Sequence, residues 1–176
     1  MRLKYGVLAV LTCATAAVSH AQDDGQNVIY FGAGSAKNGN PTTTSNKEPM
    51  SIGYLRLSNT NSTVWGLDIA GEGTMLDSTW GQTNAVKQAT SFNALIGKNI
   101  GKTANSRYDA ALIVGMREET SKCPRSYLGY QCYANSEPKT TYGFNYGLAF
   151  TWTYNSLMLG VRATGESTQA MLGIRF

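Results

Sequence analysis

The sequence contains very little histidine, few cysteines and no long apolar run beyond its first segment. Its 176 residues include one histidine, His20, and three cysteines. Serine and cysteine nucleophiles usually depend on an imidazole base, so this scarcity argues against hydrolytic catalysis. Without a later run of about 18 apolar residues a transmembrane helix is excluded, and any membrane span has to be made of strands. The net charge is only +4 and there is no basic stripe, which excludes a nucleic-acid-binding surface.

The first residues have the three parts of an export signal. Arg2 and Lys4 give a basic start, residues 6–18 are mostly apolar and small, and the segment up to Ala21 has the small-x-small pattern of a cleavage site. We predict a signal peptide over residues 1–21 and a single domain over residues 22–176. Cleavage after Ala21 would remove His20 and leave a mature chain without histidine.

Eight later segments alternate, or nearly alternate, between apolar residues and small or polar ones. The clearest covers residues 140–153, in which Tyr142, Phe144 and Tyr146 share one face. Segments of about ten residues with a period of two have the length and pattern of tilted membrane-spanning strands. The predicted strands are 27–36, 50–58, 63–72, 88–98, 107–117, 140–153, 156–164 and 167–176.

The composition of the less apolar face separates a membrane barrel from a soluble one. A soluble sandwich or a lipocalin-like barrel also alternates, but its water-facing positions should carry many Lys, Glu and Thr residues. Here that face is Gly, Ala, Asn and Ser with a few charges, which suits the narrow interior of an eight-stranded barrel. The sequence therefore predicts an all-β fold, an eight-stranded antiparallel up-and-down transmembrane β-barrel, whose aromatic-rich face meets lipid.

The connections between these strands differ in length between the two ends of the predicted barrel. Long loops outside and short turns in the periplasm are the pattern of bacterial barrels, and only the tight outer turn at 165–166 departs from it. All four prolines fall in or beside long connections, where they interrupt no strand ladder. The predicted outer connections are 37–49, 73–87, 118–139 and 165–166, and the inner ones are 59–62, 99–106 and 154–155.

The last predicted strand ends on an aromatic residue. Ile174 and Leu172 share the face of Phe176. Together with the signal peptide and the eight strands, this ending resembles the small outer-membrane β-barrels: the OmpA transmembrane domain, OmpX, NspA and the opacity-type surface proteins. The resemblance implies a bacterial outer-membrane location, contact with lipid and lipopolysaccharide, and recognition of Phe176, Ile174 and Leu172 by the barrel-assembly machinery.

The longest outer connection carries two of the three cysteines. Cys123 and Cys132 flank a polar and aromatic segment, and in an oxidising compartment a disulfide between them is the default. We predict that it stiffens the loop for display of rigid contact residues; a staple against proteolysis is the alternative. Two thiolates without histidine do not make a metal site. The candidate contact residues are Arg125, Tyr127, Tyr130 and Tyr133.

Three acids and three arginines fall on the predicted inward face. Buried charges persist when they are paired, so we expect a salt-bridge network that plugs the lumen, with Glu72 paired to Arg117 or Arg162. The alternative is a polar, gated conduit, although eight strands leave a narrow lumen. The six charges are Asp68, Glu72, Asp109, Arg117, Arg162 and Arg175.

These observations predict a non-enzymatic outer-membrane protein that displays three long surface loops. Its partners would be lipopolysaccharide, a host surface, a phage or a neighbouring cell, and a filled barrel of this kind is expected to be a monomer. We expect no cofactor, no metal and no catalytic residue. A narrow channel for ions or small solutes is the first alternative. A lipid A-modifying enzyme is a remote one, because it would have to work without histidine.

Overall fold

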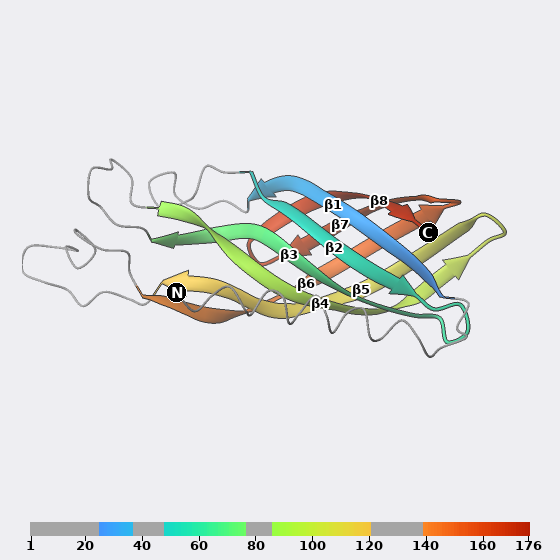
Figure 1. Ribbon diagram of the computed structural model, residues 1–176, viewed down its shortest axis with the longest axis horizontal. Coiled ribbons are helices and arrows are strands. Elements are labelled where there is room, and N and C mark those ends of the chain that lie inside the picture. Colours follow the sequence, from blue (N-terminus) through green and yellow to red (C-terminus); the bar gives the residue numbers. More distant parts are fainter. Residues whose placement is uncertain (1–24, 37–47, 77–85, 121–138) are drawn as a thin grey trace, which may run out of the picture.

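Alternating side chains and short turns fold the chain into eight antiparallel strands, each hydrogen-bonded to the next and the last to the first, so that the sheet closes into a barrel (Figure 1). The computed structural model describes residues 25–36, 48–76, 86–120 and 139–176. No helix in these ranges is long and apolar enough to cross a membrane. The strands are β1 Gln26–Ala36, β2 Met50–Leu57, β3 Thr63–Leu76, β4 Val86–Lys102, β5 Ser106–Thr120, β6 Thr140–Tyr154, β7 Leu157–Thr164 and β8 Ser167–Arg175.

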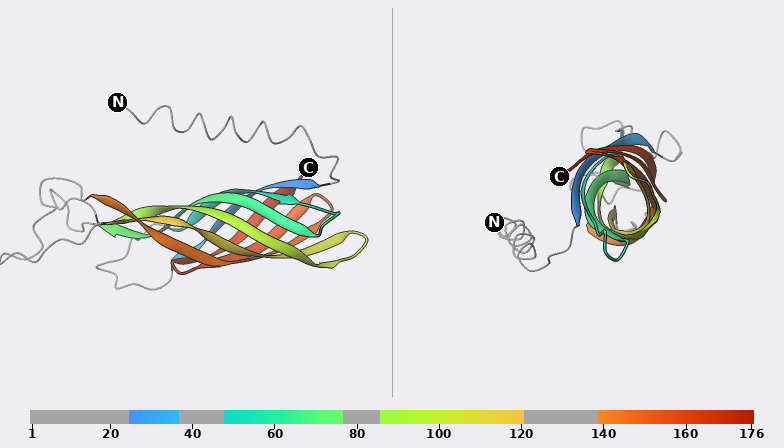
Figure 2. Two further views of the ribbon diagram at one scale, coloured as in Figure 1. Left: turned by 90° about the horizontal axis from the view of Figure 1, so that it is seen from below. Right: turned by 90° about the vertical axis from the view of Figure 1, so that its right-hand side faces the viewer.

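The barrel closes where β1 pairs with β8. Their register runs from Val28 opposite Arg175 to Ala36 opposite Ser167. Asn27 and Phe176 extend the ladder by exchanging two backbone hydrogen bonds of 2.9 Å. Seen along its axis, the sheet forms a complete ring (Figure 2). The predicted fold class, an eight-stranded antiparallel closed barrel, is confirmed.

The two ends of the barrel are named here by their connections. The loop end is the end at which connections 37–49, 77–85 and 121–139 join the strands. The turn end is the opposite one, where β1 begins, β8 finishes and the β2–β3, β4–β5 and β6–β7 turns lie (Figure 1).

Strands β3 and β4 run beyond the predicted ends at 72 and 98, and an irregularity lies near each of these ends. The β3–β4 register shifts between Gly71 and Thr74, where Gly73 has a φ of 80°, a conformation that glycine adopts without steric cost. The β4–β5 register shifts between Asn99 and Gly101. The extra residue of a bulge reverses which face the following side chains point to. The apolar–polar alternation of the sequence therefore breaks at 72 and 98, although strand pairing continues to Leu76 and Lys102.

The polarity of the barrel is inverted relative to a soluble protein. Large apolar side chains cover the outer wall: Phe144 is 70% exposed, Phe31 61% and Leu67 58%. Charged side chains lie inside, and Arg162 and Glu72 are both 0% exposed. On β1 and β2, where the sequence pattern is blurred, the structure resolves the faces: Ile29, Phe31 and Ile52 point outward, while Tyr30 and Leu55 are buried.

A buried apolar cluster fills the middle of the lumen. Every strand contributes to it, and most members are 0–2% exposed. Sequence analysis expected small and polar inward residues, and this layer is the main departure from that expectation. It also explains why β2 alternates poorly, since both of its faces are apolar there. The cluster comprises Val28, Tyr30, Leu55, Leu57, Val64, Leu95, Ala111, Ile113, Ala149, Met158 and Met171.

Candidate functional site

The lumen holds a polar cluster on the loop-end side of the apolar layer, which we call the loop-end cluster. Its centre is Glu72, the last inward position of β3 before the bulge. Both carboxylate oxygens are saturated: Oε1 lies 3.2 Å from Arg162 Nη2, and Oε2 lies 3.1 Å from Arg162 Nη1. Four neutral groups also donate to Glu72, from strands β4, β6 and β7 and from the first residue of β8. They are Ser91 Oγ at 2.8 Å, Asn145 Nδ2 at 3.0 Å, Thr164 Oγ1 at 2.8 Å and Ser167 Oγ at 2.6 Å.

Asp68 belongs to the same cluster and lies two inward positions further into the barrel along β3, beyond Ala70. Its Oδ2 lies 3.2 Å from Arg162 Nε, an ion pair that lacks hydrogen-bond geometry. Tyr30 donates its hydroxyl hydrogen to Oδ2 at 2.9 Å, and Asn93 Nδ2 donates to Oδ1 at 2.7 Å. Arg162 therefore bridges two acids, and neutral donors complete the set. Buried charges are tolerated when they are paired and hydrogen-bonded in this way.

A second polar group, the turn-end cluster, lies on the other side of the apolar layer. Arg107 Nε donates to both oxygens of Asp109, at 2.8 and 3.0 Å, and both side chains are nearly fully buried. Asn99 Nδ2 donates to Asp109 Oδ1 at 3.1 Å. Arg107 Nη1 reaches across the mouth to the carbonyl of Ser58, at 3.0 Å, and to Asn59 Oδ1, at 3.1 Å.

The structure distributes the six predicted lumen charges over separate groups. It brings Asp68, Glu72 and Arg162 together. Asp109 pairs with Arg107, and Arg117 pairs at the loop-end rim with Glu119 at 2.8 Å and Glu166 at 3.2 Å. Arg175 donates to the neutral Gln26 Oε1 at 2.9 Å, at the turn end. The contacts of Arg117 therefore differ from the expected pairing with Glu72, while those of Arg162 agree with it.

Arg107 belongs to the turn-end cluster but is absent from the predicted inward charges. It shares the inward face with Asp109, two positions later, and the alternation alone could have placed it there. The alternation predicts a strand that begins at Arg107, whereas β5 begins one residue earlier, at Ser106. The missed signal was therefore an inward basic residue directly beside an inward acid.

Several predicted site residues lie outside the described ranges, so the predictions about them stand as predictions. They include the disulfide pair and the loop contact candidates. Phe176, Ile174 and Leu172 are described: all three point outward, with exposures of 67%, 67% and 56%. The structure places them on the outer wall beside β1 and leaves their recognition during assembly as a prediction. The residues outside are Cys123, Cys132, Arg125, Tyr127, Tyr130 and Tyr133.

The described residues contain no cluster of metal ligands: no three His, Cys, Asp or Glu side chains gather as metal ligands would. In the loop-end cluster each carboxylate oxygen accepts hydrogen bonds, and the Ser and Thr hydroxyl groups donate to the Glu72 carboxylate. This arrangement stabilises charge inside the barrel.

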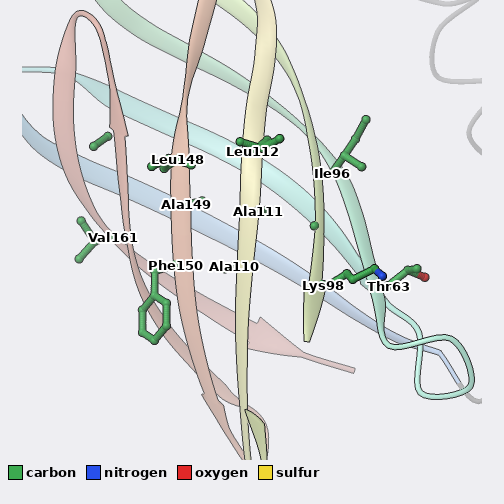
Figure 3. Close-up of a pocket in the computed structure, with 12 residues that line it drawn as sticks. Thr63, Ile96, Lys98, Ala110, Ala111, Leu112, Leu148, Ala149, Phe150 and Val161 are labelled. Carbon is green, nitrogen blue, oxygen red and sulfur yellow. The ribbon is translucent and has the colours of Figure 1, made fainter. Parts of the chain in front are cut away.

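The outer wall carries an apolar groove of about 680 Å³ over β3–β7 (Figure 3). Ile96, Leu112, Leu148 and Phe150 border it, and the small Ala110 and Ala163 leave its floor open. Lys98 and Thr63, which face each other in the β3–β4 register, lie at its turn-end side. The groove faces away from the lumen and is part of the exposed apolar band.

Comparison with known proteins gives matches among solved structures alone. No family model and no curated protein matches the sequence. The outer membrane protein Ail of Yersinia pestis, in a phospholipid bilayer nanodisc, is similar at 13% identity and a TM-score of 0.47, over 87% of this chain and 100% of that one. The crystal structure of Ail with the heparin analogue sucrose octasulfate gives 13% identity and a TM-score of 0.47, over 86% and 97% of the two chains.

Proposed function

We propose that this protein is a non-enzymatic barrel of the bacterial outer membrane that presents the connections 37–49, 77–85 and 121–139 at the cell surface for adhesion, recognition or a structural role. The observation that carries the proposal is the inverted polarity: Leu, Ile, Phe, Trp and Tyr side chains cover the outside, while ion pairs are buried inside. An exposed apolar band around a whole molecule is unfavourable in water and favourable in the hydrocarbon core of a bilayer.

Aromatic pairs near both ends of the outer wall support a membrane position. Tyr54 and Trp65 pack edge to face near the turn end, with ring centroids 6.1 Å apart. Phe144 and Tyr146 stack near the loop end, with centroids 5.9 Å apart. Amphipathic aromatic side chains concentrate at the two membrane interfaces. The apolar groove between these levels would contact acyl chains.

The filled lumen argues against the channel alternative. The apolar layer takes side chains from all eight strands, and Val28, Tyr30 and Met158 in it are inaccessible to water. An ion crossing this layer would lose its hydration without gaining a charged partner, which is costly. The apolar layer between the two polar clusters therefore supports a plugged lumen over a conducting one.

Two measurements test the proposal. Purified outer membranes are run on an SDS gel unheated and boiled, and a mobility shift is expected because a closed barrel resists SDS until heated. Protease added to intact cells should cut within the three connections and leave the barrel strands protected. Recovery of the protein in the soluble periplasm, without a heat shift, would overturn the proposal. Planar-bilayer recordings with steady single-channel conductance would instead favour the channel.

A further inference from the structure

A small polar cavity opens at the turn-end mouth of the barrel. Its volume is about 210 Å³, and three of its lining residues are cations, Lys102, Arg107 and Arg175. None of the lining residues is acidic; the others are amides and hydroxyls, with one alanine. A concave site with this lining offers hydrogen-bond donors and positive charge together.

Two of these three cations have neutral partners. Lys102 Nζ donates to Asn59 Oδ1 at 3.3 Å, and Arg175 Nη1 donates to Gln26 Oε1 at 2.9 Å. The ion pairs formed between described residues include neither of them. Arg107 alone has an acidic partner, Asp109. Among the described side chains, three cations, Lys102, Arg107 and Arg175, therefore stand against one acid, Asp109.

Arg107 also has an unused donor. Its Nε and Nη1 are hydrogen-bonded, but Nη2 is buried and has no hydrogen-bond partner among the described residues. A buried donor without an acceptor costs free energy, and more so when it is charged. An acceptor supplied from the cavity would remove this cost after the edge of the guanidinium turns towards it.

The walls of the cavity are held in place by contacts between separate turns. The backbone N–H of Asn155 donates to the carbonyl of Asn105 at 3.2 Å, and Asn155 has a φ of 49°. Arg107 ties β5 to Ser58 in the β2–β3 connection. Such pre-organisation lowers the entropy that binding a ligand would cost.

We infer that this cavity binds a compact oxyanion, a phosphate or the phosphomonoester headgroup of a lipid. Guanidinium and ammonium groups recognise phosphate through short charge-assisted hydrogen bonds. A water molecule occupies about 30 Å³ in the liquid, so the cavity has room for one phosphate group with a few waters. The anion lies at the mouth, on the opposite side of the apolar layer from the loop-end cluster.

The first experiment titrates inorganic phosphate into the ¹⁵N-labelled protein in a non-ionic detergent and follows amide chemical shifts. Saturable shifts are expected at Lys102–Arg107, Asn155 and Arg175. Lys102→Gln and Arg175→Gln should each weaken binding by about tenfold, the worth of one charge-assisted hydrogen bond. Lys98→Gln is the matched control, because it removes the same charge from the outer wall and should leave the affinity unchanged.

A second arm separates the two sources of the anion. The protein is placed in phosphatidylcholine nanodiscs with and without phosphatidic acid. Shifts with free phosphate assign a soluble ligand, and shifts at the same residues with phosphatidic acid alone assign a lipid headgroup. The inference is overturned if neither probe gives saturable shifts, if Lys102→Gln and Arg175→Gln bind like the wild type, or if Lys98→Gln weakens binding equally.

Discussion

The two polar clusters of the lumen contain the same kinds of side chain and differ in how their arginine is placed. In the loop-end cluster, Arg162 lies between two acids, and Arg162 and several neutral donors supply partners to all four carboxylate oxygens. In the turn-end cluster, Arg107 pairs with a single acid, Asp109, and lines a cavity with two further cations. Each arginine has one buried N–H without a hydrogen bond, but Arg162 Nε lies 3.2 Å from Asp68 Oδ2, whereas Arg107 lies beside a cavity from which a ligand can supply an acceptor.

The apolar layer makes this difference possible. It separates the clusters, so the acids near the loop end cannot neutralise the cations near the turn end. Along β3 the chain passes from Val64 to Asp68 and Glu72, and along β5 it passes from Arg107 and Asp109 to Ile113. Each strand therefore crosses the layer once, and the two clusters can be tested by separate substitutions.

The largest loss in the free energy of unfolding is expected from reversing the charge of Glu72, at the centre of the loop-end cluster. Glu72→Lys places an ammonium group against Arg162 in a fully buried site, and breaking a buried ion pair costs about 3–5 kcal/mol. Adding Arg162→Glu should restore a substantial part of the free energy of unfolding, measured by urea denaturation in lipid vesicles. Adding Arg117→Glu instead should restore nothing, because Arg117 pairs with Glu119 and Glu166. Equal rescue by both second changes would show that the lumen charges act as one diffuse network.

A smaller effect is expected at the turn end. Asp109→Asn removes the acid that faces Arg107 and should cost about 1–3 kcal/mol, the penalty for a buried group that loses its partner. Added phosphate should offset part of this loss, because a ligand that binds only the folded state raises stability. Phosphate should give no such recovery to Glu72→Gln, whose site it does not reach. Thermal unfolding with and without phosphate makes the comparison, and equal recovery of the two variants would contradict the separation of the clusters.

Tyr30 joins the apolar layer to the loop-end cluster. Removing its hydroxyl group should lower the free energy of unfolding by less than the two substitutions above. Tyr30→Phe keeps the ring in the layer and removes one hydrogen bond to Asp68, which retains Asn93 and Arg162. The expected loss is about 1–1.5 kcal/mol in the free energy of unfolding. A much larger loss would mean that Asp68 depends on the hydroxyl more than on Arg162.

The sequence predicts the architecture well because the outward face follows one simple rule. From Tyr142 to Trp152 every second residue is a large apolar or aromatic side chain exposed on the outer wall, and this regularity defines strand β6 without further knowledge. The inward face follows no single rule. Tyr30, for example, fits because Gly53 lies opposite it, and a methyl group built on Gly53 would overlap the ring. Such pairs depend on the register between strands, which alternation does not specify.

The candidate site was predicted only in part, because alternation gives the face of each residue but not the register between strands. Alternation placed Glu72 and Arg162 inside and near the same end, and their pairing followed from charge. It could not show that Arg117 lies at the rim, because that depends on the bulge around Gly73 and on the tight turn that carries Glu166. The cavity at the mouth was also beyond sequence reasoning, since it is assembled from three turns and the start of β1.

The smallest change in the free energy of unfolding is expected at the loop-end rim, where Arg117 lies. Arg117→Gln breaks the ion pairs with Glu119 and Glu166, whose side chains are 44% and 33% exposed. Pairs at this level of exposure contribute about 0–1 kcal/mol, because water screens the charges and ordering the side chains costs entropy. The free energy of unfolding should therefore change by less than about 1 kcal/mol, and raising the salt concentration should reduce the difference further. A loss comparable to that of Glu72→Lys, insensitive to salt, would place Arg117 in the loop-end cluster and make the rim part of the plug.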